Sequence, residues 1–314
     1  MSKILKIAYL AGGASHTLDP FYSLLESKHK LRIVCTKKNL ISGRSKKKNN
    51  NLLLEEAENN NIICVTPKNF SESDSIIQFK KLNLDLAIVF SYGVLLPKDF
   101  LSIPKYGCIN IHTSLLPKWR GASPVQHALI NNEKETGFTF ILMNESLDEG
   151  DIIFKKKILI CQNDNYETLL NKITKLASNY IVNIIEKLAD NNIKLTKQNN
   201  EESTYCYKIK KEDSYINFNE TVQAVYGKIR AFNPNPGAKC FIKGELVKIL
   251  EAKVENSNNK CGKYGEVIDD ELQVACKVGS IKFTKIQRQG RRAMQTSEVL
   301  NGWKVEKGII LNAR

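Results

Sequence analysis

The chain has 314 residues, of which 42% are hydrophobic and 25% charged, a balance that excludes an intrinsically disordered protein and is typical of a soluble globular one. This length exceeds what one small hydrophobic core serves and predicts two domains. The formal net charge of +14 favours an acidic partner, most of all nucleic acid or an anionic membrane surface. A general bias of the composition toward lysine is the alternative explanation of this charge.

Eight cysteines stand at scattered positions, with neither a Cys-x-x-Cys pair nor a histidine at metal-ligand spacing. The sequence therefore predicts no metal site and no disulfide framework. No segment approaches the roughly 20 apolar residues that span a bilayer, and the apolar run in the first 13 residues is too short for a signal peptide. We expect a cytoplasmic protein without membrane contact.

The first part of the chain alternates between short apolar runs and helix-like segments. The apolar runs, each predicted as a strand, cover residues 6–11, 31–36, 62–66, 86–90 and 108–112. Helix-like segments at 18–28 and 73–83 lie between them. Strands that alternate with helices predict an α/β fold, here a Rossmann-like, mostly parallel sheet with helices on both faces.

Two more strands are predicted at 139–144 and 151–160, and the clearest helix, at 166–190, keeps one face apolar at helical spacing. We assign residues 1–190 to one domain on this basis. The polar, Asn-rich residues 191–206 have the composition of a linker.

The sequence pattern changes at residue 207, where a second domain is predicted to begin. Short strand candidates at 238–242, 246–254, 272–278 and 280–287 are separated by glycine-containing turns. They predict a small, OB-like β-barrel domain over residues 207–314.

Positive charge is denser in this second domain. Residues 205–314 hold 20 Lys and Arg against 12 Asp and Glu, an excess of 8, whereas the longer preceding part has an excess of 6. The sharpest cluster, RQGRR at 288–292, is either a solvated face or a surface that binds anions.

Asn110 and His112 are the polar pair with the clearest chemical potential. They lie two residues apart in a predicted strand, so both side chains project from the same face. Ligands of open α/β sheets bind beyond the carboxyl ends of the strands, and this strand ends at His112. Histidine can donate a proton near neutral pH and an asparagine amide can donate to an oxyanion, which suits acyl transfer. A core histidine with satisfied hydrogen bonds is the alternative interpretation.

This chemistry also requires a carboxylate that orients and charges the imidazole. The segment NESLDEGDII, residues 144–153, supplies it from the turn between two predicted strands. The residues alone leave four candidates open, namely Glu145, Asp148, Glu149 and Asp151.

Several motifs together resemble the folate-dependent formyltransferase family. NIHTSLLPKWRGASP (110–124) and LDEGDII (147–153) are similar to its core pattern of Asn-x-His, Ser-Leu-Leu-Pro, Arg-Gly and Leu-Asp-x-Gly-Asp. RAFNPNPGA (230–238) and ISGRSKKK (41–48) resemble a C-terminal motif and a basic insertion loop of those members that act on tRNA. The resemblance covers nearly the whole chain.

The resemblance implies an enzyme that transfers the formyl group of 10-formyltetrahydrofolate to the α-amine of methionine on initiator methionyl-tRNA, for translation initiation. It implies that Asn110 and protonated His112 stabilise the oxyanion, while Asp148 holds His112 and assists proton transfer through water. The folate contacts that it implies are Tyr92, Gly93, Ser114, Leu115, Leu116 and Pro117. No metal is implied, and a monomer is expected.

Contacts to tRNA are expected from the two basic clusters, because lysine and arginine neutralise phosphates. The residues are Arg44, Lys46, Lys47, Lys48, Arg288, Arg291 and Arg292. Without the resemblance, the loop SGRSKKKNN is most simply a flexible polar loop.

The chain departs from the family pattern at two places. AGGASHTLDPF (11–21) stands where the family usually has a Gly-Thr-Pro-x-Phe-Ala turn, and Asn235 replaces an aromatic residue. Two other functions remain open at this point: a formyltransferase that acts on a small amine, and an RNA-binding protein with a relic catalytic fold. The basic loop and the basic second domain favour tRNA over the small amine, and retention of all three polar residues argues against the relic.

Overall fold

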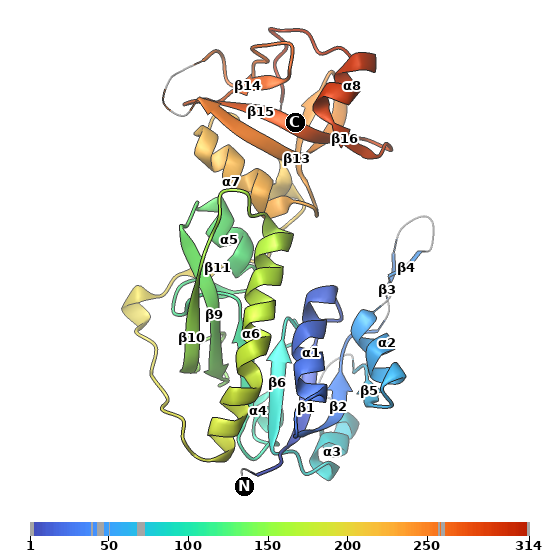
Figure 1. Ribbon diagram of the computed structural model, residues 1–314, viewed down its shortest axis with the longest axis vertical. Coiled ribbons are helices and arrows are strands. Elements are labelled where there is room, and N and C mark those ends of the chain that lie inside the picture. Colours follow the sequence, from blue (N-terminus) through green and yellow to red (C-terminus); the bar gives the residue numbers. More distant parts are fainter. Residues whose placement is uncertain are drawn as a thin grey trace. The chain divides into compact units, whose positions relative to one another are not determined.

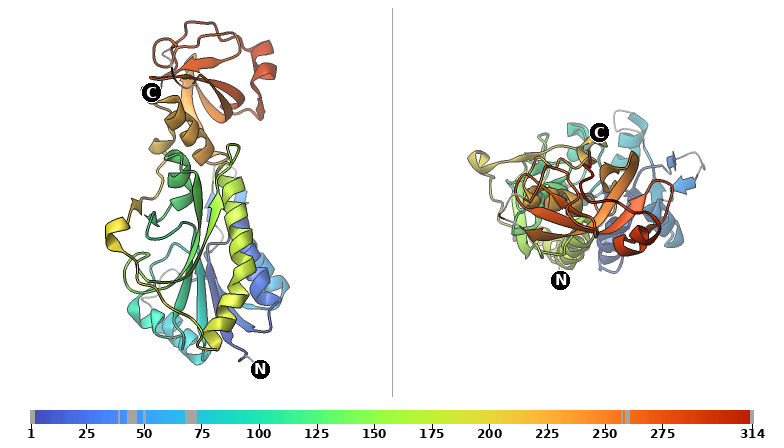
Figure 2. Two further views of the ribbon diagram at one scale, coloured as in Figure 1. Left: turned by 60° about the vertical axis from the view of Figure 1, so that its left-hand side comes forward. Right: turned by 90° about the horizontal axis from the view of Figure 1, so that it is seen from above.

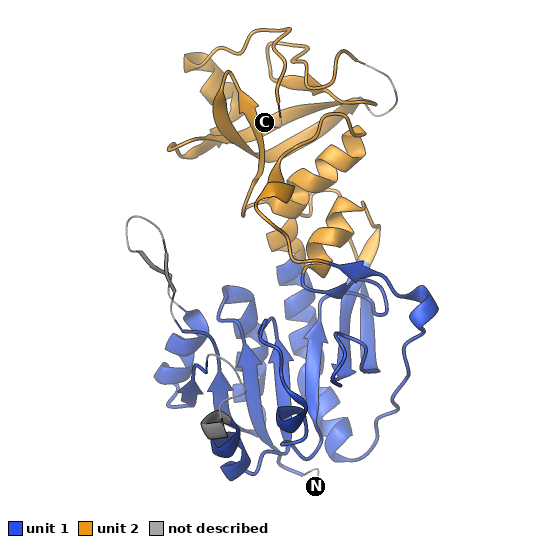
Figure 3. Ribbon diagram, turned by 180° about the vertical axis from the view of Figure 1, so that it is seen from behind, with its two compact units in different colours: residues 1–122, 136–158, 170–206 blue, residues 123–135, 159–169, 207–314 orange. Residues whose placement is uncertain are grey.

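The computed structural model describes residues 3–38, 40–42, 47–49, 51–67, 73–256, 258 and 261–312. The chain divides into two compact units (Figure 3). Unit 1 comprises residues 1–122, 136–158 and 170–206, and unit 2 comprises residues 123–135, 159–169 and 207–314. No helix in the described part of the chain is long and apolar enough to cross a membrane.

Unit 1 is built on a seven-stranded sheet with the strand order β10-β9-β7-β6-β1-β2-β5 (Figure 1). Its strands are β1 (Lys6–Ala11), β2 (Lys30–Cys35), β5 (Ile63–Val65), β6 (Leu86–Phe90), β7 (Cys108–His112), β9 (Glu135–Leu142) and β10 (Asp151–Leu159). The strands from β7 to β5 are parallel to their neighbours, and β9 is antiparallel to β7. The predicted α/β fold with a mostly parallel sheet is confirmed.

Helices cover both faces of this sheet. They are α1 (Leu18–Leu25), α2 (Leu52–Asn59), α3 (Ser73–Lys81), α4 (Lys98–Leu101) and α6 (Tyr166–Ala189), with 3-10 turns at Ser15–Thr17 and Asn200–Glu202. Alternate residues Ala8 and Leu10 of β1 belong to the same buried cluster as Phe79 of α3 and Phe100 of α4. Helix α6 runs along the other face of the sheet (Figures 1 and 2). Because both faces are covered, the central strand β6 is apolar and buried along its whole length.

Two short pairs of strands complete unit 1. They are β3 (Leu40–Ser42) with β4 (Lys47–Asn49), and β8 (Arg120–Gly121) with β11 (Tyr205–Cys206). The second pair is parallel and joins residues that are far apart in the sequence.

The observed bounds of β6 and β7 agree with the predicted strands at 86–90 and 108–112. Strand β9 begins at Glu135, four residues before the predicted start. The third residue of β9 is Gly137, where an added Cβ would lie 2.0 Å from the backbone oxygen of Lys156 in β10. A glycine at this position allows the two backbones to approach closely.

Unit 2 contains a five-stranded antiparallel sheet with the order β12-β13-β15-β14, to which β16 adds on β15. The strands are β12 (Ala238–Ile242), β13 (Glu245–Asn256), β14 (Gln273–Ala275), β15 (Ser280–Arg288) and β16 (Ala293–Gln295). The register between β13 and β15 shifts three times, and such irregularities bend a strand and increase its twist. The predicted small β domain is therefore present as a curled antiparallel sheet.

Helices α5 (Pro124–Ile130), α7 (Val222–Phe232) and α8 (Thr296–Gly302), with a 3-10 turn at Glu212–Ser214, belong to unit 2. Gly227 of α7 lies directly against the end of α5. A Cβ on Gly227 would lie 2.6 Å from the backbone oxygen of Leu129 and 2.9 Å from that of Ile130. Since backbone atoms cannot turn aside as a side chain can, glycine is required at this contact.

Substituting Gly227→Ala should lower the free energy of unfolding of unit 2 by about 1–3 kcal/mol, because the added methyl group forces the two helices apart. Thermal or chemical unfolding measures this. Gly302→Ala is the matched control, since Gly302 is also helical but has no atom within 4 Å of an added Cβ. Equal stability of the two variants would contradict the close packing.

His16 lies beyond the carboxyl end of β1, in the segment where the chain departs from the family pattern. Its half-buried ring packs edge-on against Phe90, with ring centroids 5.5 Å apart, and its Nε2 lies 3.3 Å from the Ser91 hydroxyl oxygen. Burial lowers the pKa of His16 from 6.5 to about 4. The imidazole is therefore neutral at neutral pH.

Because the unfolded chain protonates this histidine more readily than the folded one does, the contribution of His16 to stability falls as the pH drops from 6.5 to about 4. Its size is up to about 3 kcal/mol over that interval. Denaturant unfolding of the wild type and of His16→Gln at several pH values isolates this contribution by difference. Curves that run parallel from pH 7 to pH 4 would show that the ring is not held neutral.

Candidate active site

Asn110 and His112 project from β7, as their spacing predicts. Every residue of this strand is buried except Asn110, which is half-exposed. An asparagine side chain reachable at the carboxyl end of an otherwise buried strand is available to a ligand. His112 is only 5% exposed, so its ring contacts the protein rather than solvent.

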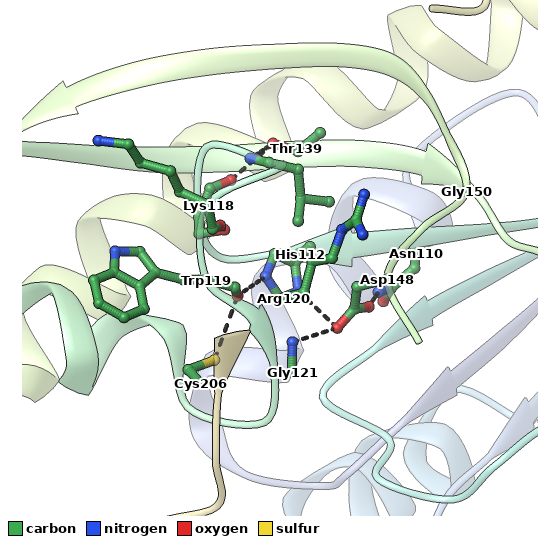
Figure 4. A network of polar contacts seen from close by, with 12 residues as sticks. Asn110, His112, Lys118, Trp119, Arg120, Gly121, Thr139, Asp148, Gly150 and Cys206 are labelled. Carbon is green, nitrogen blue, oxygen red and sulfur yellow. Dashed lines mark hydrogen bonds and ion pairs between the residues drawn. The ribbon is translucent and has the colours of Figure 1, made fainter. Parts of the chain in front are cut away.

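Of the four candidate carboxylates, Asp148 is the one that reaches this pair (Figure 4). Its Oδ1 accepts from Asn110 Nδ2 at 3.0 Å, and its Oδ2 accepts from the Gly121 backbone N–H at 2.9 Å. The other three lie elsewhere: Glu145 pairs with Lys98, Glu149 with Arg120, and Asp151 begins β10.

These contacts fix the orientation of the Asp148 side chain, because both carboxylate oxygens accept hydrogen bonds from N–H donors. Asp148 adopts a left-handed backbone conformation, with φ of 55°, which an aspartate tolerates better than most residues. A loop of this shape turns the carboxylate toward β7.

The two nitrogens of His112 face two acceptors. Nε2 lies 2.8 Å from the backbone oxygen of Trp119, and a carbonyl only accepts, so Nε2 carries a hydrogen. Nδ1 lies 3.5 Å from Asp148 Oδ2. Each ring nitrogen of His112 therefore faces an oxygen atom of the protein.

The turn that follows β7 sets the position of the Trp119 carbonyl. Thr139 of β9 ties this turn down: its hydroxyl donates to Ser114 O at 2.7 Å and accepts from Leu116 N at 3.1 Å. The Ser114 hydroxyl in turn donates to Lys118 O at 2.6 Å. Trp119 then adopts φ of 62°, and its carbonyl accepts from both His112 and the Cys206 thiol.

The residues expected to contact folate differ in accessibility. Tyr92, Ser114 and Leu116 are at most 2% exposed, and the Tyr92 hydroxyl lies 3.1 Å from Cys35 Sγ. Burial raises the pKa of Tyr92 well above its ordinary value. Leu115 is half-buried, Pro117 is buried and Gly93 is exposed. In this structure the surface that a ligand could reach is therefore offered by Gly93 and Leu115.

Two loops border the polar network. Residues 91–97 follow β6 and residues 143–150 join β9 to β10, and Lys98 and Glu145 connect the two through an ion pair of 2.8 Å. Each loop exposes a leucine: Leu95 is 80% and Leu147 is 61% exposed. Exposed apolar side chains beside convergent polar groups are typical of the wall of a ligand site.

The residues expected to contact tRNA are found in different settings. Arg44 and Lys46 lie outside the described residues, and Lys47 and Lys48 belong to β4. Arg291 and Arg292 are exposed in the turn between β15 and β16.

Arg288 has a different environment from its two neighbours in the cluster. It forms a bidentate ion pair with Glu245, with an Nη2–Oε2 distance of 2.6 Å, and its guanidinium lies 4.2 Å from the Trp303 ring. The hydrogen bond from Arg288 lowers the pKa of Glu245. The positive charge of Arg288 is therefore already compensated by Glu245 within unit 2.

The sequence analysis did not identify Arg120 and Gln198, whose hydrogen bonds hold the loop that carries Asp148. Arg120 is 1% exposed, and its guanidinium is bound by Gln198 of the segment expected to be a linker. The only sequence feature that pointed to Arg120 was the Arg-Gly dipeptide of the family core. Nothing in the sequence pointed to Gln198, because it is a single glutamine in an Asn-rich stretch. Among the described residues, no group of three or more His, Cys, Asp or Glu side chains is arranged to hold a metal ion.

Comparison with known proteins agrees with this geometry. Residues 5–185 match the family described as formyl transferase, and residues 208–304 match the formyl transferase C-terminal domain. The methionyl-tRNA formyltransferase of Pelagibacter ubique is 38% identical over 288 residues, which cover 91% of this chain and 92% of that protein.

Two solved structures share the fold. WlaRD, a sugar 3N-formyl transferase solved with dTDP and 5-N-formyl-THF, matches with a TM-score of 0.66 and 22% identity over 92% of this chain and all of its own. HypX from Aquifex aeolicus in complex with tetrahydrofolic acid matches with a TM-score of 0.65 and 17% identity; the match covers 95% of this chain but 47% of HypX. The chain therefore belongs to the formyl transferase family, and the methionyl-tRNA formyltransferase of Pelagibacter ubique is one relative that it matches over nine-tenths of its length.

Proposed function

We propose that this protein transfers the formyl group of 10-formyltetrahydrofolate to the α-amine of methionine on initiator methionyl-tRNA, and so supplies formyl-methionyl-tRNA for translation initiation. The observation that carries the proposal is the network of Asn110, His112 and Asp148. It stands in a chain that matches a protein named methionyl-tRNA formyltransferase over 91% of its own length.

The site fits the proposed donor in two respects. Asn110 uses one Nδ2–H on Asp148, and no described residue accepts its second N–H, which leaves that hydrogen for a carbonyl oxygen of a substrate. Leu95 and Leu147 offer apolar surface for a fused aromatic ring system. Donors of this kind, together with an apolar wall, match a ligand with an amide-like head and a flat heterocycle.

When bound, the donor supplies a formyl carbonyl, whose oxygen gains negative charge as the acceptor amine attacks the carbon. Asn110 donates its second N–H to that oxygen. Both N–H groups of the His112 imidazolium are directed at protein acceptors, so His112 acts through its positive charge. Asp148 keeps the ring charged and assists removal of the amine proton through water. The bond from the formyl carbon to the folate nitrogen then breaks, and that nitrogen takes up the proton that the amine has lost, so that tetrahydrofolate leaves.

The acceptor is proposed from charge and from the relative. A small amine gives no reason for the +8 excess on residues 205–314 or for the basic segment 41–48. We propose Arg291, Arg292 and the segment with Arg44, Lys46, Lys47 and Lys48 as phosphate contacts, and a secondary role for Arg288 because Glu245 compensates its charge. We further propose that the protein acts as a cytoplasmic monomer.

The acceptor is tested by transfer of labelled formyl from 10-formyltetrahydrofolate to methionyl-tRNA, with glycinamide ribonucleotide and free methionine as parallel acceptors. We expect product on methionyl-tRNA alone. Product on a small amine alone would retain the chemistry and overturn the RNA acceptor, and no product on any of them would favour the relic.

The catalytic roles are tested by Asn110→Ala, His112→Asn and Asp148→Asn, each of which should lower kcat by about 10²–10⁴-fold, because each removes a group that stabilises charge or moves a proton in the transition state. Affinity for tRNA, measured by filter binding, should stay nearly unchanged. Asp190→Asn is the control, since it makes the same change on an exposed aspartate. Wild-type kcat in all three variants would refute the mechanism.

A further inference from the structure

The segment 191–206 makes an unusual set of contacts with the catalytic network. The side-chain Nε2 of Gln198 donates to the backbone oxygens of Asp148 and Gly150, each at 2.8 Å. Its Oε1 accepts from Arg120 Nε at 3.0 Å and from Arg120 Nη2 at 2.9 Å. Because carbonyls only accept and a guanidinium only donates, all four bonds require this one orientation of the amide.

Arg120 is the second part of this arrangement. Its buried guanidinium must have its donors satisfied, because an unpaired buried charge is costly. Besides Gln198, it donates to Asn200 Oδ1 at 2.8 Å and to the Tyr205 hydroxyl at 3.2 Å, and it pairs with Glu149 at 3.2 Å. Glu149 adjoins Asp148, so the guanidinium is held from the segment and from the catalytic loop together.

Backbone contacts hold the turn after β7 in the same way. Trp119 N donates to Thr204 Oγ1 at 2.9 Å, and Arg120 N donates to Thr204 O at 2.8 Å. These bonds continue into the pairing of β8 with β11. The segment therefore holds both the carbonyl that orients His112 and the loop that carries Asp148.

Trp119 and Asp148, the two residues that this segment holds, have the same unfavourable backbone conformation. Trp119 and Asp148 both have positive φ, of 62° and 55°, a conformation that costs a non-glycine residue on the order of 1 kcal/mol or more. Both also lie outside the regular strands, so the sheet alone does not fix them. External hydrogen bonds must supply what the backbone lacks.

We propose that Gln198 is a positioning residue of the active site, which places the Asp148 carboxylate against His112 and Asn110, with Arg120 and Thr204 completing the same clamp. Residues 198–206 are on this view part of the catalytic machinery. The proposal rests on the proposed function for its kinetic consequences, whereas its structural consequences are independent of it.

Gln198→Glu tests the clamp selectively. The variant keeps the side-chain length and an acceptor for Arg120, but replaces the N–H donors by an oxygen that repels the carbonyls of Asp148 and Gly150. Gln162→Glu is the matched control, because it makes the same change of charge on an exposed side chain.

The first readout does not depend on activity. The Gly121 amide donates to Asp148 Oδ2, so its hydrogen exchange, measured by NMR, reports whether the carboxylate is in place. Exchange of the Gly121 amide should be faster in Gln198→Glu than in the wild type and in Gln162→Glu. Equal exchange in all three proteins would overturn the clamp.

The second readout is formyl transfer. We expect kcat of Gln198→Glu to fall by about 10- to 100-fold, as for a misplaced catalytic group, while KM for both substrates changes far less. A merely structural lesion would reduce the amount of active protein and leave kcat per active molecule in place, which would also overturn the proposal.

Two further comparisons keep the outcomes distinct. If Gln198→Glu does not fold, Gln198→Met, which has similar length and lacks both the donor and the acceptor, is examined for the same exchange and kinetic changes. If the wild type transfers no formyl group, the proposed function fails, and the exchange of the Gly121 amide still decides the clamp.

Discussion

The partly buried carboxylate of Asp148 is the group on which the rest of the site depends. One charged side chain, 11% exposed, accepts from an asparagine amide and a backbone N–H and faces an imidazole. A charge at this depth is stable only when its partners surround it, and here two partners come from β7 and the third, Gly121, from β8. The contacts of Asn110, His112 and Gly121 are thus the condition for burying the carboxylate and, in the proposed mechanism, the means by which it acts.

The sheet and the loops contribute differently to this arrangement. Asn110 and His112 are fixed by β7, which lies between β6 and β9 and is buried on both faces, so their geometry follows from the rigid part of the fold. Asp148 and Trp119 stand in irregular chain with positive φ. Their position depends on added support, and the buried Arg120 is a sign of it, since a guanidinium is retained in a protein interior only where its donors are all engaged.

Charge is distributed in a way that composition does not reveal. Among the three arginines of the 288–292 cluster, Arg288 stacks on Trp303 and pairs with Glu245, whereas Arg291 and Arg292 are exposed. A cluster that looks uniform in sequence thus contains both a structural and an available charge. The excess of 8 positive charges on residues 205–314 remains large enough to favour a polyanionic partner.

The sequence by itself determined the α/β class, the strands at 86–90 and 108–112 and the common face of Asn110 and His112, because the hydrophobic period and strand alternation are local properties. It also narrowed the carboxylate to one short loop. The residues alone left four carboxylates open, the family resemblance pointed to Asp148, and the tertiary structure shows Asp148 in contact with the pair. Only the tertiary structure decided that Gln198 reaches the same loop from fifty residues away in the chain. The physical reason is that hydrogen bonds between distant segments leave no periodic trace: a polar residue in a polar stretch has the same pattern whether it is solvated or clamps a buried arginine.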